Sequence, residues 1–331
     1  MTVNSNWGAM FCVPMLRVGA FSLLLVLGVP AYGAADGAPD EPRISIEPRL
    51  KAPLHSDFRI DSNLVLLPVN VTDRQNRSVT GLDAGEFRVF EGATEQKVLH
   101  LSTDDAPLSV GIVFDASGSM ASKLGKAREA VAEFLKGANP SDEFFLVNFS
   151  GKAELAVPFT QSHEDIQGRL IATKSEGKTA LLDGVYLALI QMKKAGNARK
   201  ALLVISDGGE NDSRYSEGEI RKMVRESDVW IYAIGIYARA PQMLPEEERG
   251  GPKLLTDVAE QTGGRHLAVH HENELPDAAA KVGLELRNRY ILAYSPANAA
   301  RDGKYHRVQV KLSGRRDLHL SWRPGYFAPA R

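Results

Sequence analysis

The middle of the chain, residues 109–289, alternates between apolar stretches of strand length and segments of helix length. Continuous apolar runs occur at 110–114, 144–149, 201–205 and 229–236. Two intervening segments, 121–136 and 180–194, carry apolar residues at intervals of three and four, as amphipathic helices do. Apolar strands separated by such helices are typical of a mostly parallel sheet that helices cover on both faces. The sequence therefore predicts an α/β fold with a doubly wound, mostly parallel sheet.

Shorter, alternating strand patterns lie on both sides of this region. They are expected at 64–71, 87–91, 96–101, 290–295, 305–312 and 318–322. The N-terminal group, within 62–104, is too small to bury a core of its own. We therefore expect the C-terminal strands, within 290–331, to complete an N-terminal β module, with the α/β domain at 105–289 between the two groups.

The first 33 residues have the pattern of a secretory signal peptide. An apolar run at 16–29 contains one basic residue, Arg17, and small residues occupy the first and last positions of 31–33. The run is shorter than the roughly 20 apolar residues that a membrane-spanning helix needs. We predict a signal peptide at 1–33, a linker at 34–61, and a secreted or periplasmic protein. A membrane attachment is expected only if the signal stays uncleaved.

Charge and cysteine content exclude several classes of partner and site. The full chain has 40 basic and 41 acidic residues, and removal of 1–33 takes away only Arg17, which leaves a net charge of −2. The single cysteine, Cys12, lies in the same segment, so neither a disulfide framework nor a cysteine-based metal site is expected. A balanced charge offers no electrostatic footprint for nucleic acid. We therefore expect no nucleic-acid partner.

Polar residues stand where two expected strands end and one expected helix begins. Asp115, Ser117 and Ser119 follow the run 110–114. Asp207 follows another apolar run, and Thr179 opens a helix. Because the carboxyl ends of parallel strands meet at one edge of a sheet, these side chains should lie close together. Two carboxylates and three hydroxyls form an all-oxygen set that suits a hard divalent cation.

The order of these residues resembles the metal-ion-dependent adhesion site of the von Willebrand factor type A domain, whose pattern is D-x-S-x-S, then T, then D. Other segments resemble a bacterial group of exported proteins that carry such a domain. These segments are VTGL at 79–82, EFRVFE at 86–91, APLSV at 106–110, RNRY at 287–290 and PGYF at 324–327. The resemblance covers about 62–328. It implies a Rossmann-like sheet and a bound Mg²⁺, with Mn²⁺ or Ca²⁺ as substitutes.

The resemblance also implies a role for each residue. Ser117 and Ser119 would bind Mg²⁺ directly, and Thr179 would bind it directly or through water. Asp115 and Asp207 would act mostly through water or hydrogen-bonded hydroxyls. The metal would then keep an open position for an Asp or Glu of a partner protein. The expected function is therefore Mg²⁺-dependent protein binding and adhesion.

Two alternatives keep the fold and change the role of the loops. Asp115, Asp207 and the serines could be helix N-caps that follow strands. Alternatively, the metal could be purely structural in a scaffold for envelope assembly. The segment 241–252 follows an expected strand, so it belongs at the same edge of the sheet, where it could shape the choice of partner.

A third alternative is a metal-assisted hydrolase. A serine nucleophile such as Ser117 needs a nearby base, and none of the eight histidines stands beside the three loops in sequence. The triplet 177–179 is similar to the end of a phosphate-binding loop, but Ala172 stands where that motif requires glycine. We therefore expect a binding protein and no enzyme.

Overall fold

The computed structural model describes residues 64–103, 105–237, 250–297 and 302–330. The predicted signal peptide and linker, and positions 241–249 of the predicted loop, lie outside these residues. Within the described ranges, no helix is both long enough and apolar enough to cross a membrane.

A six-stranded sheet with the order β10-β9-β8-β5-β6-β7 forms the centre of the α/β domain. Its strands are β5 (Leu108–Asp115), β6 (Glu143–Phe149), β7 (Ala153–Thr160), β8 (Arg199–Ser206), β9 (Trp230–Ile236) and β10 (His266–Val269). All neighbours run parallel except β6 and β7. The predicted mostly parallel sheet is thus confirmed. The two edge strands, β7 and β10, were not predicted, because β7 is half exposed and β10 has only four residues.

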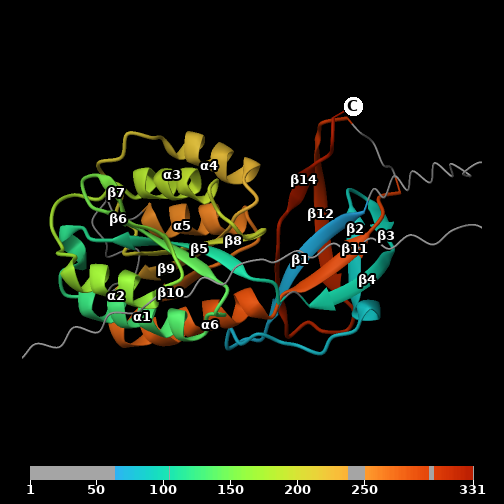
Figure 1. Cartoon of the computed structure of the whole chain (residues 1–331). Coiled ribbons are helices and arrows are strands. Elements are labelled where there is room, and N and C mark those ends of the chain that lie inside the picture. Colours follow the sequence, from blue (N-terminus) through green and yellow to red (C-terminus); the bar gives the residue numbers. More distant parts are fainter. Residues whose placement is uncertain (1–63, 104, 238–249, 298–301, 331) are drawn as a thin grey trace, which may run out of the picture. The chain divides into compact units, whose positions relative to one another are not determined.

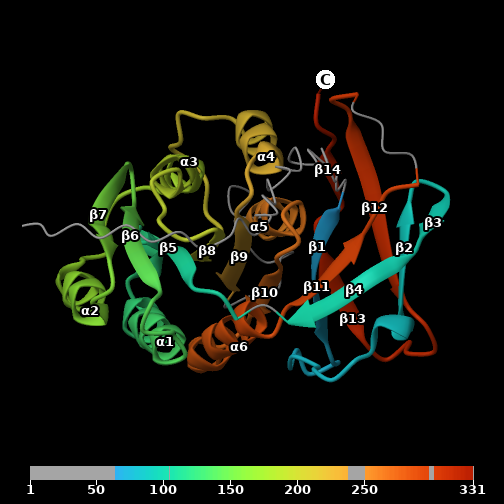
Figure 2. The ribbon, with the colours of Figure 1, turned by 45° about the vertical axis from the view of Figure 1, so that its right-hand side comes forward.

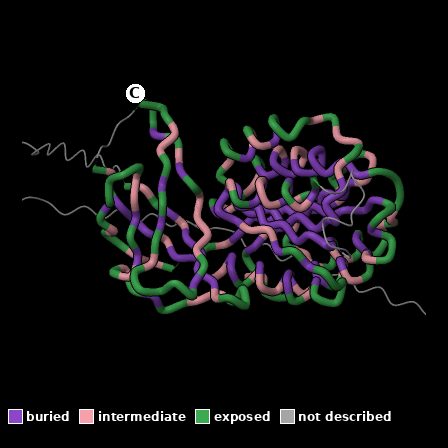
Figure 3. Tube along the Cα trace, turned by 180° about the vertical axis from the view of Figure 1, so that it is seen from behind, coloured by how far each residue is buried: buried purple, intermediate pink, exposed green. Residues whose placement is uncertain are grey.

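Helices cover both faces of this sheet (Figure 1). One face packs against α1 (Leu124–Lys136), α2 (His163–Ala172) and α6 (Leu275–Arg287). The other packs against α3 (Leu181–Met192), α4 (Glu217–Glu226) and α5 (Gly251–Glu260). The strands between the two layers are buried, as the purple trace in Figure 3 shows. The helix predicted at 121–136 begins three residues later, since a 3₁₀ turn, η2 (Gly118–Met120), precedes it.

The remaining strands form two antiparallel sheets, ordered β13-β1-β11-β4 and β14-β12-β2-β3 (Figure 2). They are β1 (Val65–Thr72), β2 (Phe87–Glu91), β3 (Thr94–Gln96), β4 (Val98–Thr103), β11 (Tyr290–Tyr294), β12 (Tyr305–Leu312), β13 (His319–Trp322) and β14 (Gly325–Phe327). N-terminal strands pair with C-terminal ones, β1 with β11 and β13, and β2 with β12. Apolar side chains from both groups share one core, as we predicted for a composite module.

One strand of this module differs from the prediction. The single strand expected at 96–101 is two strands, because β3 ends at Gln96 and β4 begins at Val98 in the other sheet. The predicted boundaries at 62–104, 105–289 and 290–331 stay predictions, since the described residues all belong to one compact unit, Ile60–Arg331.

Candidate metal site

Asp115 is the last residue of β5, and its fully buried carboxylate organises the first loop. Its Oδ1 accepts a hydrogen bond from the backbone N–H of Ser117 at 2.9 Å, and its Oδ2 accepts one from the hydroxyl of Ser206 at 2.5 Å. Ser117 precedes η2, but its side chain makes no capping hydrogen bond. Its Oγ lies 3.1 Å from Oγ of Ser119, which is exposed. The two hydroxyls are therefore neighbours, and the N-cap alternative does not describe Ser117.

The second loop follows β8 and carries Asp207, which is buried. Gly208 has a φ of +83°, a left-handed conformation that favours glycine. A Cβ at Gly208 would also lie 3.1 Å from Cα of Gly251, at the beginning of α5. At Gly209, a Cβ would lie 3.2 Å from Oγ1 of Thr179. The two glycines thus allow the Asp207 loop to pack against α5 on one side and against Thr179 on the other.

The third loop, 173–180, leads into α3 and is bonded to the first loop through the backbone. Gly118 N–H donates to the Gly177 carbonyl at 3.0 Å, and Glu176 N–H donates to the Ala116 carbonyl at 2.9 Å. Thr179 is buried two residues before the first residue of α3. The structure therefore brings all five predicted residues to the carboxyl edge of the sheet. Their role as metal ligands stays a prediction.

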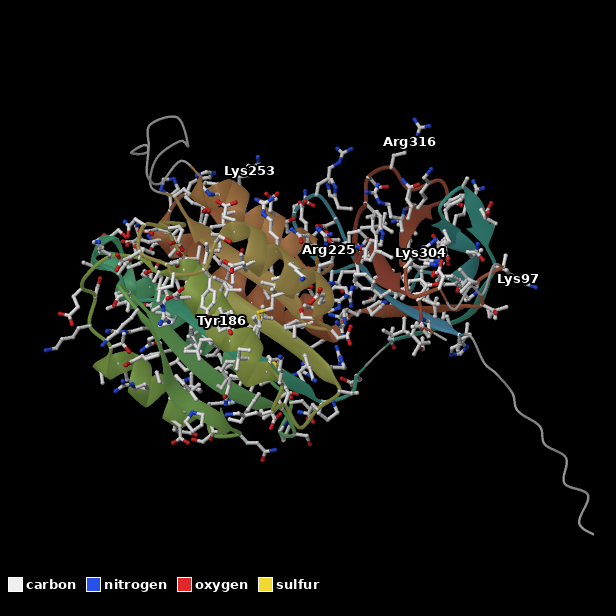
Figure 4. All side chains as sticks on the ribbon, turned by 90° about the horizontal axis from the view of Figure 1, so that it is seen from above. Lys97, Tyr186, Arg225, Lys253, Lys304 and Arg316 are labelled. Carbon is white, nitrogen blue, oxygen red and sulfur yellow. The ribbon has the colours of Figure 1, made fainter. Side chains whose placement is uncertain are left out.

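The chain beyond Asp207 is held against the first turns of α3. Glu210 accepts a hydrogen bond from Leu182 N–H at 2.9 Å, and Asp183 accepts bonds from the backbone and the guanidinium of Arg214, both at 2.9 Å. The ring of Tyr186, labelled on α3 in Figure 4, stacks on the ring of Tyr215 at a centroid distance of 3.8 Å. The second and third loops are therefore fixed to each other as well as to the sheet.

The charge environment of Asp115 includes the second acid, Asp207. Burial, and then the charge of Asp207, raise the pKa of Asp115 to about 6. Lys123, just before α1, places Nζ 2.7 Å from Oδ2 of Asp207, and its side chain is only 17% exposed. Lys123 was not predicted as part of the site, because it lies outside the D-x-S-x-S pattern. The one feature of the sequence that could have indicated Lys123 is its position, four residues after Ser119 and directly before the next helix.

The residues present fit a divalent cation. Neighbouring hydroxyls and two acids form the hard oxygen set that Mg²⁺ prefers. The ammonium of Lys123 also acts as a stand-in cation against Asp207, which shows that this position attracts positive charge. Across the described residues, no group of three or more histidines, cysteines or acids is arranged to hold a metal. The candidate site is of a different kind, because three of its five candidate donors are hydroxyls and only two are acids.

A chain of hydrogen bonds lies behind the Asp207 loop. Tyr237, which follows β9, has its hydroxyl 3.2 Å from Nε2 of His266, and Nδ1 of that ring lies 2.8 Å from the hydroxyl of Thr256. Thr256 donates to the Pro252 carbonyl, so the ring donates from Nδ1 and accepts at Nε2. Burial lowers the pKa of His266 to about 4, and the ring is therefore neutral at physiological pH.

The positions of the histidines and of Lys178 bear on the hydrolase alternative. Within the described part of the chain, no histidine is hydrogen-bonded to any of the five candidate ligands. Lys178, from the sequence similar to a phosphate-binding loop, is 68% exposed and pairs with Asp212 at 2.8 Å.

Comparison with known proteins finds similarity over part of the chain. Residues 110–210 match the family model of the von Willebrand factor type A domain. The chain is 25% identical over 202 residues to an uncharacterized protein of Borreliella burgdorferi, covering 54% of this chain and 58% of that one. It is 27% identical over 188 residues to inter-alpha-trypsin inhibitor heavy chain H4 of Sus scrofa, covering 54% and 20%. Both matches span less than two thirds of the relative's length.

Among solved structures, the von Willebrand factor type A protein of Catenulispora acidiphila is similar to this chain with a TM-score of 0.49 and 13% identity. That alignment covers 81% of this chain and 73% of the other.

Proposed function

Since the chain carries a domain of the von Willebrand factor type A family at residues 110–210, we propose that it is an exported, Mg²⁺-dependent protein-binding and adhesion module. Its metal site would engage an Asp or Glu side chain of a partner protein. The observation that carries this proposal is the meeting of two acids and three hydroxyls at one sheet edge, with an ammonium already drawn to Asp207.

Each residue has a distinct part in the proposed site. The hydroxyls of Ser117, Ser119 and Thr179 would hold the metal. Asp115 already accepts bonds from Ser117 N–H and Ser206, so it would orient the first loop and contribute negative charge. When bound, the metal would supply a strong attraction for a carboxylate. The exposure of Ser119 leaves this face open to a partner.

The surroundings of the site favour an acidic partner. A hollow of about 340 Å³ adjoins the first loop at Ala116, and its charged lining consists of three cations and two acids: Lys152, Lys174, Arg169, Glu154 and Glu176. Arg169 pairs with Glu154 at 2.9 Å, whereas the two lysines form no ion pair with any described residue. Because Glu176 also lines the hollow, the excess is one positive charge, which would favour a carboxylate over a basic group.

Binding of metal is the first property to test. We expect one Mg²⁺ or Mn²⁺ per chain by calorimetry, and we expect Ser119→Ala to abolish it without unfolding the domain, since Ser119 is exposed. Ser141→Ala is a matched control, because Ser141 is also exposed but precedes β6 at the opposite edge of the sheet. Equal metal affinity in both variants would contradict the proposed ligand set.

Partner binding is the second property to test. Capture of a protein from envelope extract should require Mg²⁺, be lost in EDTA, and be lost with Ser119→Ala but not with Ser141→Ala. Excess acetate, a simple carboxylate, should weaken the capture, whereas equal ionic strength as chloride should not. Capture that persists unchanged in EDTA would exclude a metal bridge and would favour the scaffold alternative.

We propose binding rather than catalysis because no described histidine is hydrogen-bonded to the site as a base. A panel of phosphoester and peptide substrates with Mg²⁺ or Mn²⁺ should give no turnover. Turnover that Ser117→Ala abolishes would contradict this part of the proposal.

Export rests on the sequence pattern of residues 1–33. Expression of the full chain in a bacterial host should yield a periplasmic or secreted product whose N-terminal residue follows Gly33. A product that retains Met1 and fractionates with the cytosol would contradict it.

A further inference from the structure

Lys123 is held in place by its backbone, and its side chain crosses to another loop. Its N–H donates to the Met120 carbonyl at 2.9 Å, and its carbonyl accepts from Ala127 N–H at 2.9 Å, so the residue joins η2 to α1. Its ammonium reaches Oδ2 of Asp207 at 2.7 Å. The contact therefore links the end of the first loop to the acid of the second.

Lys123 is the charged partner of the buried acids. Among the described residues, Oδ1 of Asp207 accepts only a long bond, 3.5 Å, from Gly209 N–H. Asp115 has neutral partners, the N–H of Ser117 and the hydroxyl of Ser206. Over the described residues, no other cation lies within ion-pair distance of either acid. Because an unpaired buried carboxylate is costly, this ammonium stabilises the metal-free loops.

We propose that Lys123 is a resident counter-cation that competes with the metal for Asp207, and that it thereby sets the metal affinity of the site. The inference rests on the proposed function, since it requires that the site binds a divalent cation. An ammonium and a dication beside the same buried carboxylate repel each other strongly in a low-dielectric site. The metal must therefore displace Nζ from Asp207 or overcome its charge.

The first test compares two lysines by calorimetry with Mg²⁺ and Mn²⁺. Lys123→Met keeps the length of the side chain and removes its charge. It should tighten metal binding by about tenfold or more, because one hydrogen-bonded counter-charge no longer competes for Asp207. Lys178→Met removes a charge that adjoins Thr179 in sequence but is exposed and paired with Asp212. It should change the affinity by less than about twofold, because exposed charges are screened.

The outcomes distinguish the proposed competition by Lys123 from the proposed metal-binding function. Equal or weaker metal binding by folded Lys123→Met, with normal binding by the wild type, overturns the competition and leaves the proposed function intact. No binding by either protein overturns both. Binding by Lys123→Met alone supports the competition in its strongest form.

The second test uses the wild-type chain and so does not depend on how a variant folds. An amine-acylating reagent, followed by mass spectrometry, reports the exposure of each lysine. Lys123 should be protected in EDTA and become several-fold more reactive in saturating Mg²⁺, whereas Lys178 should react equally in both. Unchanged protection of Lys123 under conditions where metal binding is measured would overturn the displacement.

Discussion

Ser206 donates its hydroxyl to Oδ2 of Asp115 at 2.5 Å, and so joins the last residue of β8 to the last residue of β5. The same hydroxyl accepts the N–H of Gly208 at 2.9 Å. One buried side chain therefore fixes both the first acid of the site and the turn that carries the second, Asp207.

We expect Ser206→Ala to destabilise the protein by about 1–3 kcal/mol, because a buried carboxylate oxygen and a buried N–H each lose their partner. Urea unfolding of the metal-free protein measures this change. Ser141→Ala, at an exposed serine, should change the free energy of unfolding by less than about 0.5 kcal/mol. Equal stability of the two variants would show that the Ser206 contact contributes nothing.

Gly208→Ala should destabilise the protein by about 1–3 kcal/mol, since alanine is strained at a φ of +83° and its Cβ would meet Gly251. The matched control is Gly218→Ala in α4, where a Cβ meets nothing within 4 Å. That change should stabilise by about 0.4–1 kcal/mol, because alanine restricts the unfolded chain. Thermal unfolding of both variants checks the opposite signs.

His266 should make stability depend on pH in the acidic range. Burial lowers its folded-state pKa from 6.5 to about 4, so the unfolded chain binds the proton more tightly. This contribution is fully present above pH 6.5 and is lost as the pH falls toward 4. Its upper limit is about 3 kcal/mol. His266→Gln should flatten the unfolding free energy over this interval, whereas a change at the exposed His270 should not.

His306 should make stability depend on pH in the opposite direction, so that stability falls as the pH rises. Its ring lies 2.6 Å from Glu91 and 3.2 Å from Asp302, and the bond to Glu91 is the main cause that raises its pKa above 6.5. Its contribution is fully present below pH 6.5 and is lost as the pH rises through the raised value. Unfolding followed from pH 6 to 9 should show this loss in the wild type. In His306→Gln the loss should be absent, and an unchanged pH profile would contradict the prediction.

Several features could be predicted because local pattern decides them. The apolar run of β8 has to be buried on both sides, so it predicted a strand covered by helices. The strand β12 was predicted with its observed limits, since it alternates between buried and exposed residues. The joining of N-terminal and C-terminal strands into one module was expected, because the N-terminal strands alone have a thin core. Which strands pair, such as β2 with β12, was not predicted.

Other features depend on neighbours that are distant in sequence. The edge strand β7 is half exposed and has no continuous apolar run, so periodicity did not reveal it. His266 carries no local sign that its ring is buried between Tyr237 and Thr256. The lowered pKa of that ring is a product of packing.

At the site, the oxygen-bearing residues near strand ends could be predicted, because D-x-S-x-S and the later Thr and Asp are local patterns. Their electrostatics depend on how distant segments pack. Burial, and then the charge of Asp207, raise the pKa of Asp115, because two strands that are far apart in sequence end side by side. Lys123 meets Asp207 across 84 residues of chain, a contact that depends on how α1 packs rather than on any motif. Local patterns therefore indicate which groups form the site. The packing of distant segments determines the distances between these groups, and with them the pKa of Asp115.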